Sequence, residues 1–258
     1  MKICFIGDPH GNLEKIKEIP LDNSIDLIVL TGDLGKSDLI RNIAFQKYSN
    51  QKTQISNSRY KEAFFETFNS TMEIITYLKQ FAPIKTIYGN VEFSKEETLE
   101  ISKKINLELP ILNDELKKLN VDVINNQIRI VNDTKIGGLQ YFIDTNWVDE
   151  FDPNNIDKMN YAQKETTYSN KILEGFGFVD ILVCHQPPYQ ILDRVDSQNV
   201  PENWRGKHAG SKTILNYIQK YQPKYVFCGH IHEGEGFEKV ENTEVYNLGV
   251  GGYKILEL

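Results

Sequence analysis

The sequence has few cysteines, no long apolar run and no excess of positive charge. Its three cysteines, Cys4, Cys184 and Cys228, each lie in an expected buried strand, which predicts reduced thiols in the core of a cytoplasmic protein. No run approaches the roughly 18 apolar residues that cross a bilayer, and no basic-then-apolar signal peptide precedes residue 20. A formal net charge of −7 disfavours a general nucleic-acid-binding surface, although metal ions can bring local positive charge to an anionic substrate.

The composition is that of an ordinary globular protein, with 40% hydrophobic and 25% charged residues among 258. This length fits one sizeable domain, and no linker or internal repeat divides it. We therefore expect a single domain over 1–258, with inserts near 37–57 and 144–170. The second insert should contain a helix and could form a lid or a partner surface.

Apolar periodicity predicts a mixed α/β chain. Short β-branched runs at Lys2–Ile6 and 26–31 flank a helical pattern, which indicates a β-α-β unit with parallel strands. From residue 121, short runs separated by tight turns such as Asn132-Asp133 indicate antiparallel hairpins. We expect further helices at 60–81, after Ser94 and at 211–222, further strands at 84–88, 121–125, 127–131, 134–139, 180–184 and 224–228, an irregular stretch at 189–207, and three short strands at the end.

Five short segments hold four of the five histidines, together with acid or amide side chains, and most follow a short apolar run. Groups that leave the ends of neighbouring strands can converge on one point, where seven oxygen and nitrogen ligands could hold two divalent metal ions. Taken singly, each residue is more often a turn residue, a helix cap or a hydrogen-bonded histidine. Their common placement after strands favours the metal site. The segments are Asp8-Pro9-His10, Gly32-Asp33, Gly89-Asn90-Val91-Glu92, His185 and Gly229-His230-Ile231-His232.

The ligand types indicate which metals and which chemistry to expect. Oxygen and imidazole ligands without thiolate suit Mn, Fe, Zn or similar cations better than a closed structural zinc site. Two ions about 3.5–4 Å apart need a bridging ligand, and a carboxylate suits that role. Such a pair polarises a phosphoryl group and produces hydroxide near neutral pH.

In this order and over this length, the motifs resemble the calcineurin-like metallophosphoesterase superfamily, from Ile3 to about Gly249. The resemblance implies a four-layer αββα sandwich of two mixed β-sheets flanked by helices, with a dinuclear site at the strand ends. It implies two divalent ions, with Mn favoured and Fe, Zn, Ni or Mg as alternatives. One ion would take Asp8, His10 and His232, the other Asn90, His185 and His230, and Asp33 would bridge them.

The chain departs from many members of this family at Val91, where they carry a histidine that protonates the leaving group or holds the phosphate. An aliphatic side chain cannot donate a proton, and a leaving group of low pKa needs little help. Members without that histidine resemble small bacterial and archaeal phosphodiesterases, which shifts the expectation towards phosphodiesters.

The fifth histidine, His208, lies in a glycine-flanked loop with Arg205 and Lys207, just before an expected helix. One interpretation has all three bind the substrate phosphate near the helix N-terminus, where anions are favoured, with His208 as the missing acid. The other has His208 exposed and Ser211 as a helix cap. Both interpretations remain open on the sequence alone.

These observations predict a metal-dependent phosphoesterase, preferring phosphodiesters, in which a hydroxide between the ions attacks phosphorus. Asp33, Asn90 and His208 are the expected catalytic residues, and Asn90 also binds substrate with the loop cations Arg205 and Lys207. The expected partner is a small phosphate ester such as a nucleotide, with no membrane, and nucleic acid is disfavoured. The alternative is a non-catalytic metal-binding scaffold of the same fold, although the complete ligand set favours catalysis.

Overall fold

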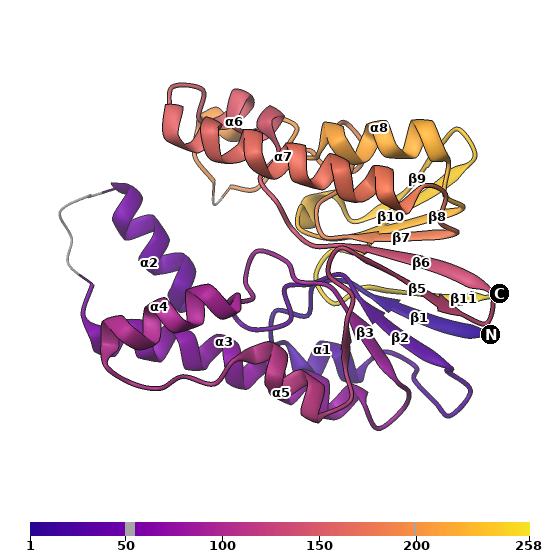
Figure 1. The fold of residues 1–258 in the computed structure, drawn as a ribbon, viewed down its shortest axis with the longest axis horizontal. Helices are drawn as coiled ribbons and strands as arrows, with labels where there is room; N and C mark the ends of the chain where they lie inside the picture. The colour runs from indigo at the N-terminus through magenta and orange to yellow at the C-terminus, as the bar shows by residue number, and fades with distance from the viewer. Residues whose placement is uncertain (50–54, 199) are drawn as a thin grey trace.

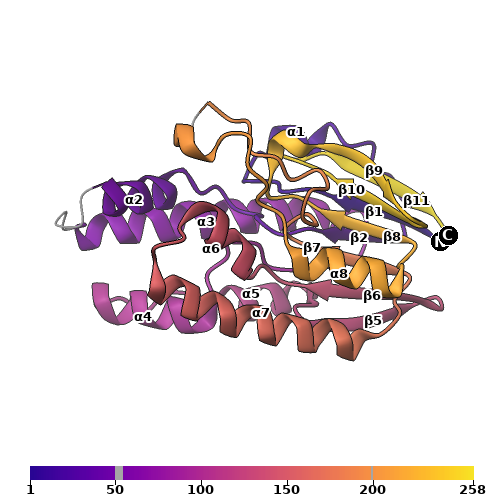
Figure 2. The same ribbon diagram turned by 90° about the horizontal axis from the view of Figure 1, so that it is seen from above.

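The computed structural model describes residues 1–49, 55–198 and 200–258. It contains two β-sheets packed face to face, with helices on both outer sides (Figure 1, Figure 2). This arrangement confirms the expected fold class. The first sheet has the order β11 (Tyr253–Glu257), β1 (Lys2–Ile6), β2 (Leu27–Leu30), β3 (Ile84–Thr86) and β4 (Asp122–Val123). The second has the order β5 (Gln127–Val131), β6 (Thr134–Leu139), β7 (Ile181–Cys184), β8 (Tyr225–Cys228), β10 (Thr243–Asn247) and β9 (Gly236–Val240).

The helices divide between the two sheets, as Figure 1 shows. Those of the first half of the chain lie on the side of the first sheet, and the later ones lie on the side of the second. The first group is α1 (Leu13–Lys17), α2 (Asp38–Ser49), α3 (Asn57–Leu78), α4 (Lys95–Ile105) and α5 (Leu112–Lys118). The second group is α6 (Thr145–Phe151), α7 (Ile156–Phe176) and α8 (Lys212–Tyr221), with short 3-10 turns at Glu202–Trp204 and His232–Gly234.

Three apolar layers hold the sandwich together, because each sheet buries both of its faces. Between the sheets, the rings of Phe5 and Phe227 stack with centroids 3.8 Å apart. Outside the first sheet, residues such as Leu30 pack against α3 through Ile75. Outside the second sheet, Leu182 and its neighbours pack against α7 and α8. The fully buried strands explain why the sequence shows continuous apolar runs rather than alternation. All three cysteines are free and buried.

Several sequence predictions need correction. The 121–125 run does not form a hairpin, because its central part, β4, pairs parallel with β3 in the first sheet. The hairpin at Asn132-Asp133 is confirmed, with β5 and β6 antiparallel and both turn residues at positive φ. The helix α5 was not foreseen, since it spans only Leu112–Lys118. Most of the expected insert at 37–57 is helical, as α2 and the start of α3, and residues 50–54 lie outside the described residues.

The strands that precede the candidate ligands point the same way. Strands β1, β2 and β3 are parallel neighbours, as are β7 and β8. Their carboxyl ends lie at the end of the sandwich away from the chain termini (Figure 1). Loops that leave these ends can therefore meet, as the sequence predicted. No helix in the described ranges is long and apolar enough to cross a membrane.

Candidate metal centre

The ligand segments occupy the turns that directly follow five strands. Asp8 follows β1 and is 0% exposed, Asp33 follows β2 and is 3% exposed, and His185 follows β7 and is 0% exposed. His10, Asp33 and His230 have positive φ angles of 44°, 47° and 67°. Such angles are uncommon for residues other than glycine. Strained backbone of this kind is concentrated at functional sites. The chain thus holds the residues in place before any ligand binds.

Asp8, His10 and His232 form a first group of potential ligands, whose ligand atoms all lie within 4.8 Å of one another. The Nε2 atoms of the two histidines are 3.2 Å apart, and Nε2 of His232 lies 3.5 Å from Oδ2 of Asp8. Nitrogen and carboxylate atoms at this spacing leave room for one cation among them.

Asp8, Asp33 and His185 form a second group within the same limit. The Nε2 atom of His185 lies 3.5 Å from Oδ1 of Asp33 and 3.0 Å from Oδ1 of Asn90. The ring of His230 lies beside that of His185, with centroids 4.9 Å apart. Asn90 and His230, the other two residues expected at this ion, therefore lie beside His185, while the group itself contains His185 alone of the three.

Asp33 belongs to the second group and also faces His10 of the first. Its Oδ2 faces Nε2 of His10 at 3.6 Å, while its Oδ1 faces Nε2 of His185 at 3.5 Å. Oδ1 also accepts a hydrogen bond from the backbone N–H of Val91 at 3.0 Å, which orients the carboxylate. One carboxylate thus presents a different oxygen to each group, which is the geometry a bridging ligand needs.

The protonation states suit metal ligands. Burial lowers the pKa of His10 to about 4 and that of His230 to about 3, so both rings are neutral near pH 7. Burial and the nearby carboxylate of Asp8 raise the pKa of Asp33. Burial would also raise the pKa of Asp8, but the charge of His185 and hydrogen bonds from His232 and His230 hold it below its usual value. Two buried carboxylates side by side form a site that a divalent cation would stabilise.

The hydrogen bonding of His185 also suits a metal ligand. Its Nδ1 donates to the carbonyl oxygen of Thr31 at 2.9 Å, so a neutral ring would carry its lone pair on Nε2. That lone pair would face the amide oxygen of Asn90 at 3.0 Å, so two acceptors would point at each other. A cation between them would stabilise this arrangement, and a carbonyl behind the histidine is the usual support of a metal-bound ring. The donor set therefore fits divalent metal ions.

Two supporting residues were not foreseen from the sequence. Glu92 belongs to the Gly-Asn-x-Glu motif, but no role was predicted for it. Its buried carboxylate accepts backbone N–H groups of Gly89 at 2.7 Å, Asp33 at 3.1 Å and Leu34 at 2.6 Å, which ties the loops after β2 and β3 together. Burial and the charge of Asp33 raise its pKa to about 7. Thr31 donates its hydroxyl to Oδ1 of Asp8 at 2.9 Å, a contact that residue spacing could not reveal.

Two more residues border the centre without sequence signals. The ring of Tyr141, in the loop after β6, lies against His230 at 5.3 Å and His185 at 5.7 Å between centroids. Arg41 in α2 lies close enough for its positive charge to contribute to the low pKa of His10. No ligand or nucleophile pattern marks either residue, so only the tertiary structure places them here.

The structure places His208 in a pair with a buried acid. Its Nδ1 donates to Oδ1 of Asp193, which is 1% exposed, at 2.7 Å, and its ring is partly exposed. The neighbouring Ala209 packs with Ile231, which lies between two of the candidate metal ligands, so the loop borders the centre. Ser211 caps α8, as one interpretation proposed.

The two loop cations contact backbone oxygens. Lys207 donates to the carbonyl of Glu150 at 2.6 Å, and Arg205 donates to that of Gln198 at 3.0 Å. Substrate binding by Lys207 and Arg205 stays a prediction, because these contacts neither test it nor bring the two cations to the centre.

Known proteins resemble this chain in sequence and in fold. The uncharacterized protein MJ1162 of Methanocaldococcus jannaschii is 28% identical over 197 residues, which are 69% of this chain and 83% of that protein. The phosphopantetheinyl hydrolase PptH of Mycobacterium tuberculosis has a TM-score of 0.55 at 13% identity, over 97% of this chain and 89% of its own. Another solved structure reaches a TM-score of 0.61 at 17% identity, over 99% of this chain and 94% of its own.

Structural similarity at such low sequence identity, 17% and 13%, shows only a shared fold. The model of the calcineurin-like phosphoesterases, by contrast, matches the sequence itself over residues 1–234. That match spans all five ligand segments and most of both sheets. The chain therefore belongs to the calcineurin-like phosphoesterase family of metal-dependent phosphoesterases.

Proposed function

We propose that the chain is a dinuclear metal-dependent phosphodiesterase that prefers manganese. The observation that supports this most is the position of Asp33, whose Oδ2 lies 3.6 Å from Nε2 of His10 and whose Oδ1 lies 3.5 Å from Nε2 of His185. A carboxylate whose two oxygens face different histidines is suited to bridge two ions.

Seven residues would hold the ions, and they divide as the family resemblance suggests. When bound, two divalent ions would supply Lewis acidity, which polarises a phosphoryl group and lowers the pKa of water. The side chains of the protein would hold these ions in place. We assign one ion to Asp8, His10 and His232, the other to Asn90, His185 and His230, and both to Asp33.

The residues around the ions orient the groups that act on the substrate. Val91 N–H holds Asp33, and Thr31 holds both Asp8 and His185, so the ligands need little rearrangement. Asn90 is exposed at the edge of the centre, where its amide can also contact the phosphoryl oxygens as charge develops. We infer that Asn90 both ligates metal and binds substrate.

His208 is the proposed proton donor to the leaving group. Asp193 fixes its Nδ1 at 2.7 Å, which leaves Nε2 as the free position on a partly exposed ring. A histidine held by a carboxylate is a common general acid, and such catalysis contributes about 10²–10⁴-fold. This role would replace the histidine that the chain lacks at Val91, which is 6% exposed and aliphatic.

The preference for phosphodiesters rests on charge. A diester carries one negative charge at neutral pH and a monoester nearly two. Carboxylates border the Asn90 side of the centre, at Glu97 and Glu165, and would repel the more highly charged monoester. The diester is therefore the better substrate for these surroundings.

The test is hydrolysis by the purified full chain with added Mn. We expect turnover of bis-p-nitrophenyl phosphate above that of p-nitrophenyl phosphate, and loss of at least about 10³-fold for Asp33→Asn. The matched control is Asp157→Asn, which changes an exposed carboxylate on α7 and should retain full activity. Faster turnover of the monoester would contradict the diester preference. No turnover of any phosphate ester or anhydride would favour the scaffold alternative.

The role of His208 needs a leaving-group comparison. His208→Ala should slow phenyl phosphodiesters by about 10²-fold, while nitrophenyl phosphodiesters should change by less than about threefold, because nitrophenolate leaves without a proton. Equal slowing of both would show that His208 does not donate the proton.

A further inference from the structure

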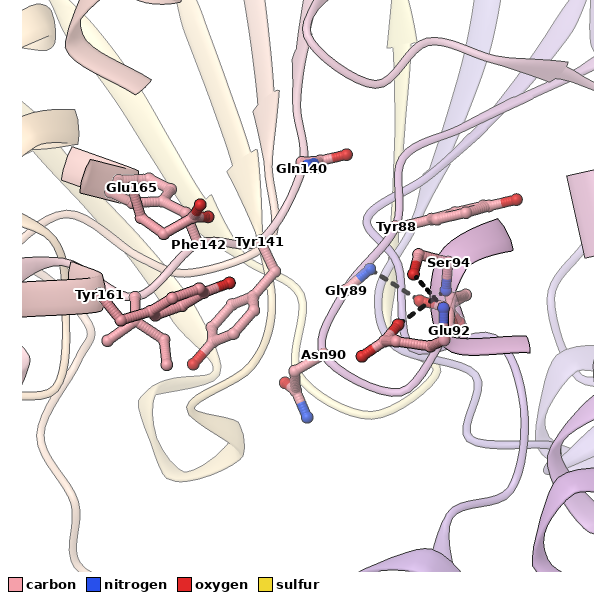
Figure 3. A pocket seen from close by; sticks show the side chains of 12 residues that line it. Tyr88, Gly89, Asn90, Glu92, Ser94, Gln140, Tyr141, Phe142, Tyr161 and Glu165 are labelled. Atoms are coloured by element: carbon pink, nitrogen blue, oxygen red, sulfur yellow. Dashed lines mark hydrogen bonds between the residues drawn. The ribbon is translucent and has the colours of Figure 1, made fainter. Parts of the chain in front are cut away.

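A cavity of about 440 Å³ adjoins the Asn90 side of the metal centre. One wall comes from the loop after β3 and the start of α4, including Asn90 and Glu97, and the other comes from residues 140–143 and α7. Figure 3 shows Asn90 on one side, with Tyr141 and Tyr161 on the other. This volume is within the range of sites for small organic molecules. The metal centre alone does not explain why a cavity of this size lies beside it.

Two tyrosine rings connect this cavity with the metal centre. Tyr141 contacts both His185 and His230, and burial, together with the charge of Asp33, raises its pKa. Tyr161 reaches towards Tyr141 from α7 (Figure 3) and is 53% exposed. Aromatic faces beside a cavity favour a planar partner, because stacking on them buries apolar area at little entropic cost. An organic group attached to a phosphate at the ions would meet these rings first.

The charged groups that line the cavity are all carboxylates. Glu97 and Glu165 supply carboxylates, and Gln140 an amide. None of the lining residues, all within the described ranges, is a lysine, arginine or histidine. Within the described part of the chain, Glu165 has no hydrogen-bond or ion-pair partner, and burial raises its pKa. A partly desolvated acceptor without a partner gains most from an N–H donor.

We propose that this cavity binds the organic part of the phosphoester substrate, and that this part is a planar base carrying an amine donor, such as adenine. The assignment rests on the proposed function, because it treats the neighbouring centre as the site of the phosphate. The base stacks on Tyr161 and Tyr141, and its amine donates to Glu165. The acidic lining also excludes a substrate whose organic part carries further phosphates, since like charges would face each other.

The test measures binding without turnover. The Mn-loaded full chain is titrated in a calorimeter with adenosine and with purine riboside, which differs only in lacking the amine. We expect adenosine to bind about tenfold more tightly, since a hydrogen bond to a charged acceptor exceeds about 1.4 kcal/mol, or tenfold. Glu165→Ala should reduce this difference to less than about threefold. Tyr161→Ala should weaken both nucleosides by about tenfold, because each loses the same stacking surface.

The control is Tyr168→Ala, which removes an exposed tyrosine of α7 that does not line this cavity and should change neither affinity. Equal binding of the two nucleosides by the wild-type chain, or no binding of either, would overturn the proposal. Turnover of methyl p-nitrophenyl phosphate by the same preparation tests the proposed function separately. Turnover without nucleoside binding would leave only the cavity assignment wrong, and selective binding without turnover would leave only the proposed function wrong.

Discussion

Replacing Asp33 with asparagine should make the metal-free protein more stable while abolishing its response to metal. Ligand oxygens of Asp8 and Asp33 lie within 4.8 Å of each other, and both side chains are buried. At an effective dielectric constant near 20, two charges at that distance repel by about 3 kcal/mol. The amide keeps an oxygen for the N–H of Val91 but adds a donor without a clear acceptor. We therefore expect a net gain of at least about 1 kcal/mol.

The assay is thermal unfolding after dialysis against a chelator, then with added Mn. A gain of 1 kcal/mol raises Tm by about 2–4 °C in a domain of this size. Manganese at 100 times its Kd should stabilise the wild type by about 2.7 kcal/mol, and the variant by much less. The order of the two proteins should thus reverse when metal is added.

The pH dependence has a definite sign. Because the folded-state pKa of Asp33 is raised, its protonated form stabilises the native state fully below its unfolded pKa, near 3.8, and this stabilisation is lost as pH rises through the folded pKa. The advantage of the asparagine variant should be small at pH 4 and largest at pH 8. An apo variant less stable than the apo wild type at pH 8 would refute the reasoning.

A second buried aspartate provides the control. Asp144 accepts hydrogen bonds from Ser211 Oγ at 2.6 Å, Thr213 N–H at 3.0 Å and Thr166 Oγ1 at 3.1 Å. The carboxylate of Asp144 is therefore surrounded by hydrogen-bond donors, whereas that of Asp33 lies beside the carboxylate of Asp8. Asp144→Asn should lower stability by about 1–3 kcal/mol, with or without metal. Opposite signs for two chemically identical substitutions would show that the effect belongs to the metal centre.

Two further substitutions test the surroundings of the ions. Gly89→Ala would place a Cβ against Asp33 and 2.6 Å from Cε1 of His185, so we expect at least about tenfold weaker Mn binding by calorimetry. Gly175→Ala, where nothing lies within 4 Å of the added atom, is its control, and equal Mn affinity of both variants would contradict the geometry. Val91→His should raise rates for phenyl esters more than for nitrophenyl esters, and equal increases would show that the position does not lack a proton donor.

Most of the fold could be predicted from the sequence because its signals are local. The strand β1 was predicted with its exact bounds, and α8 and the β5–β6 hairpin were found within a residue or two. The errors concern weak signals or pairing. Strand β4 is only two residues long, and the choice between a hairpin and a parallel partner depends on where β3 lies. No local pattern contains that information.

The sequence by itself determined the kinds of ligand and their places after strands, because residue type and apolar periodicity can be read along the chain. Only the tertiary structure decided which atoms meet, since His10 and His232 are 222 positions apart and their Nε2 atoms lie 3.2 Å apart. It alone turned one oxygen of Asp33 towards each ligand group and gave Glu92 its three backbone donors. The tertiary structure also places Glu165 of α7 in the wall of the cavity beside Asn90. Convergence of this kind depends on how the strands order themselves within each sheet, and that order is a property of the whole chain.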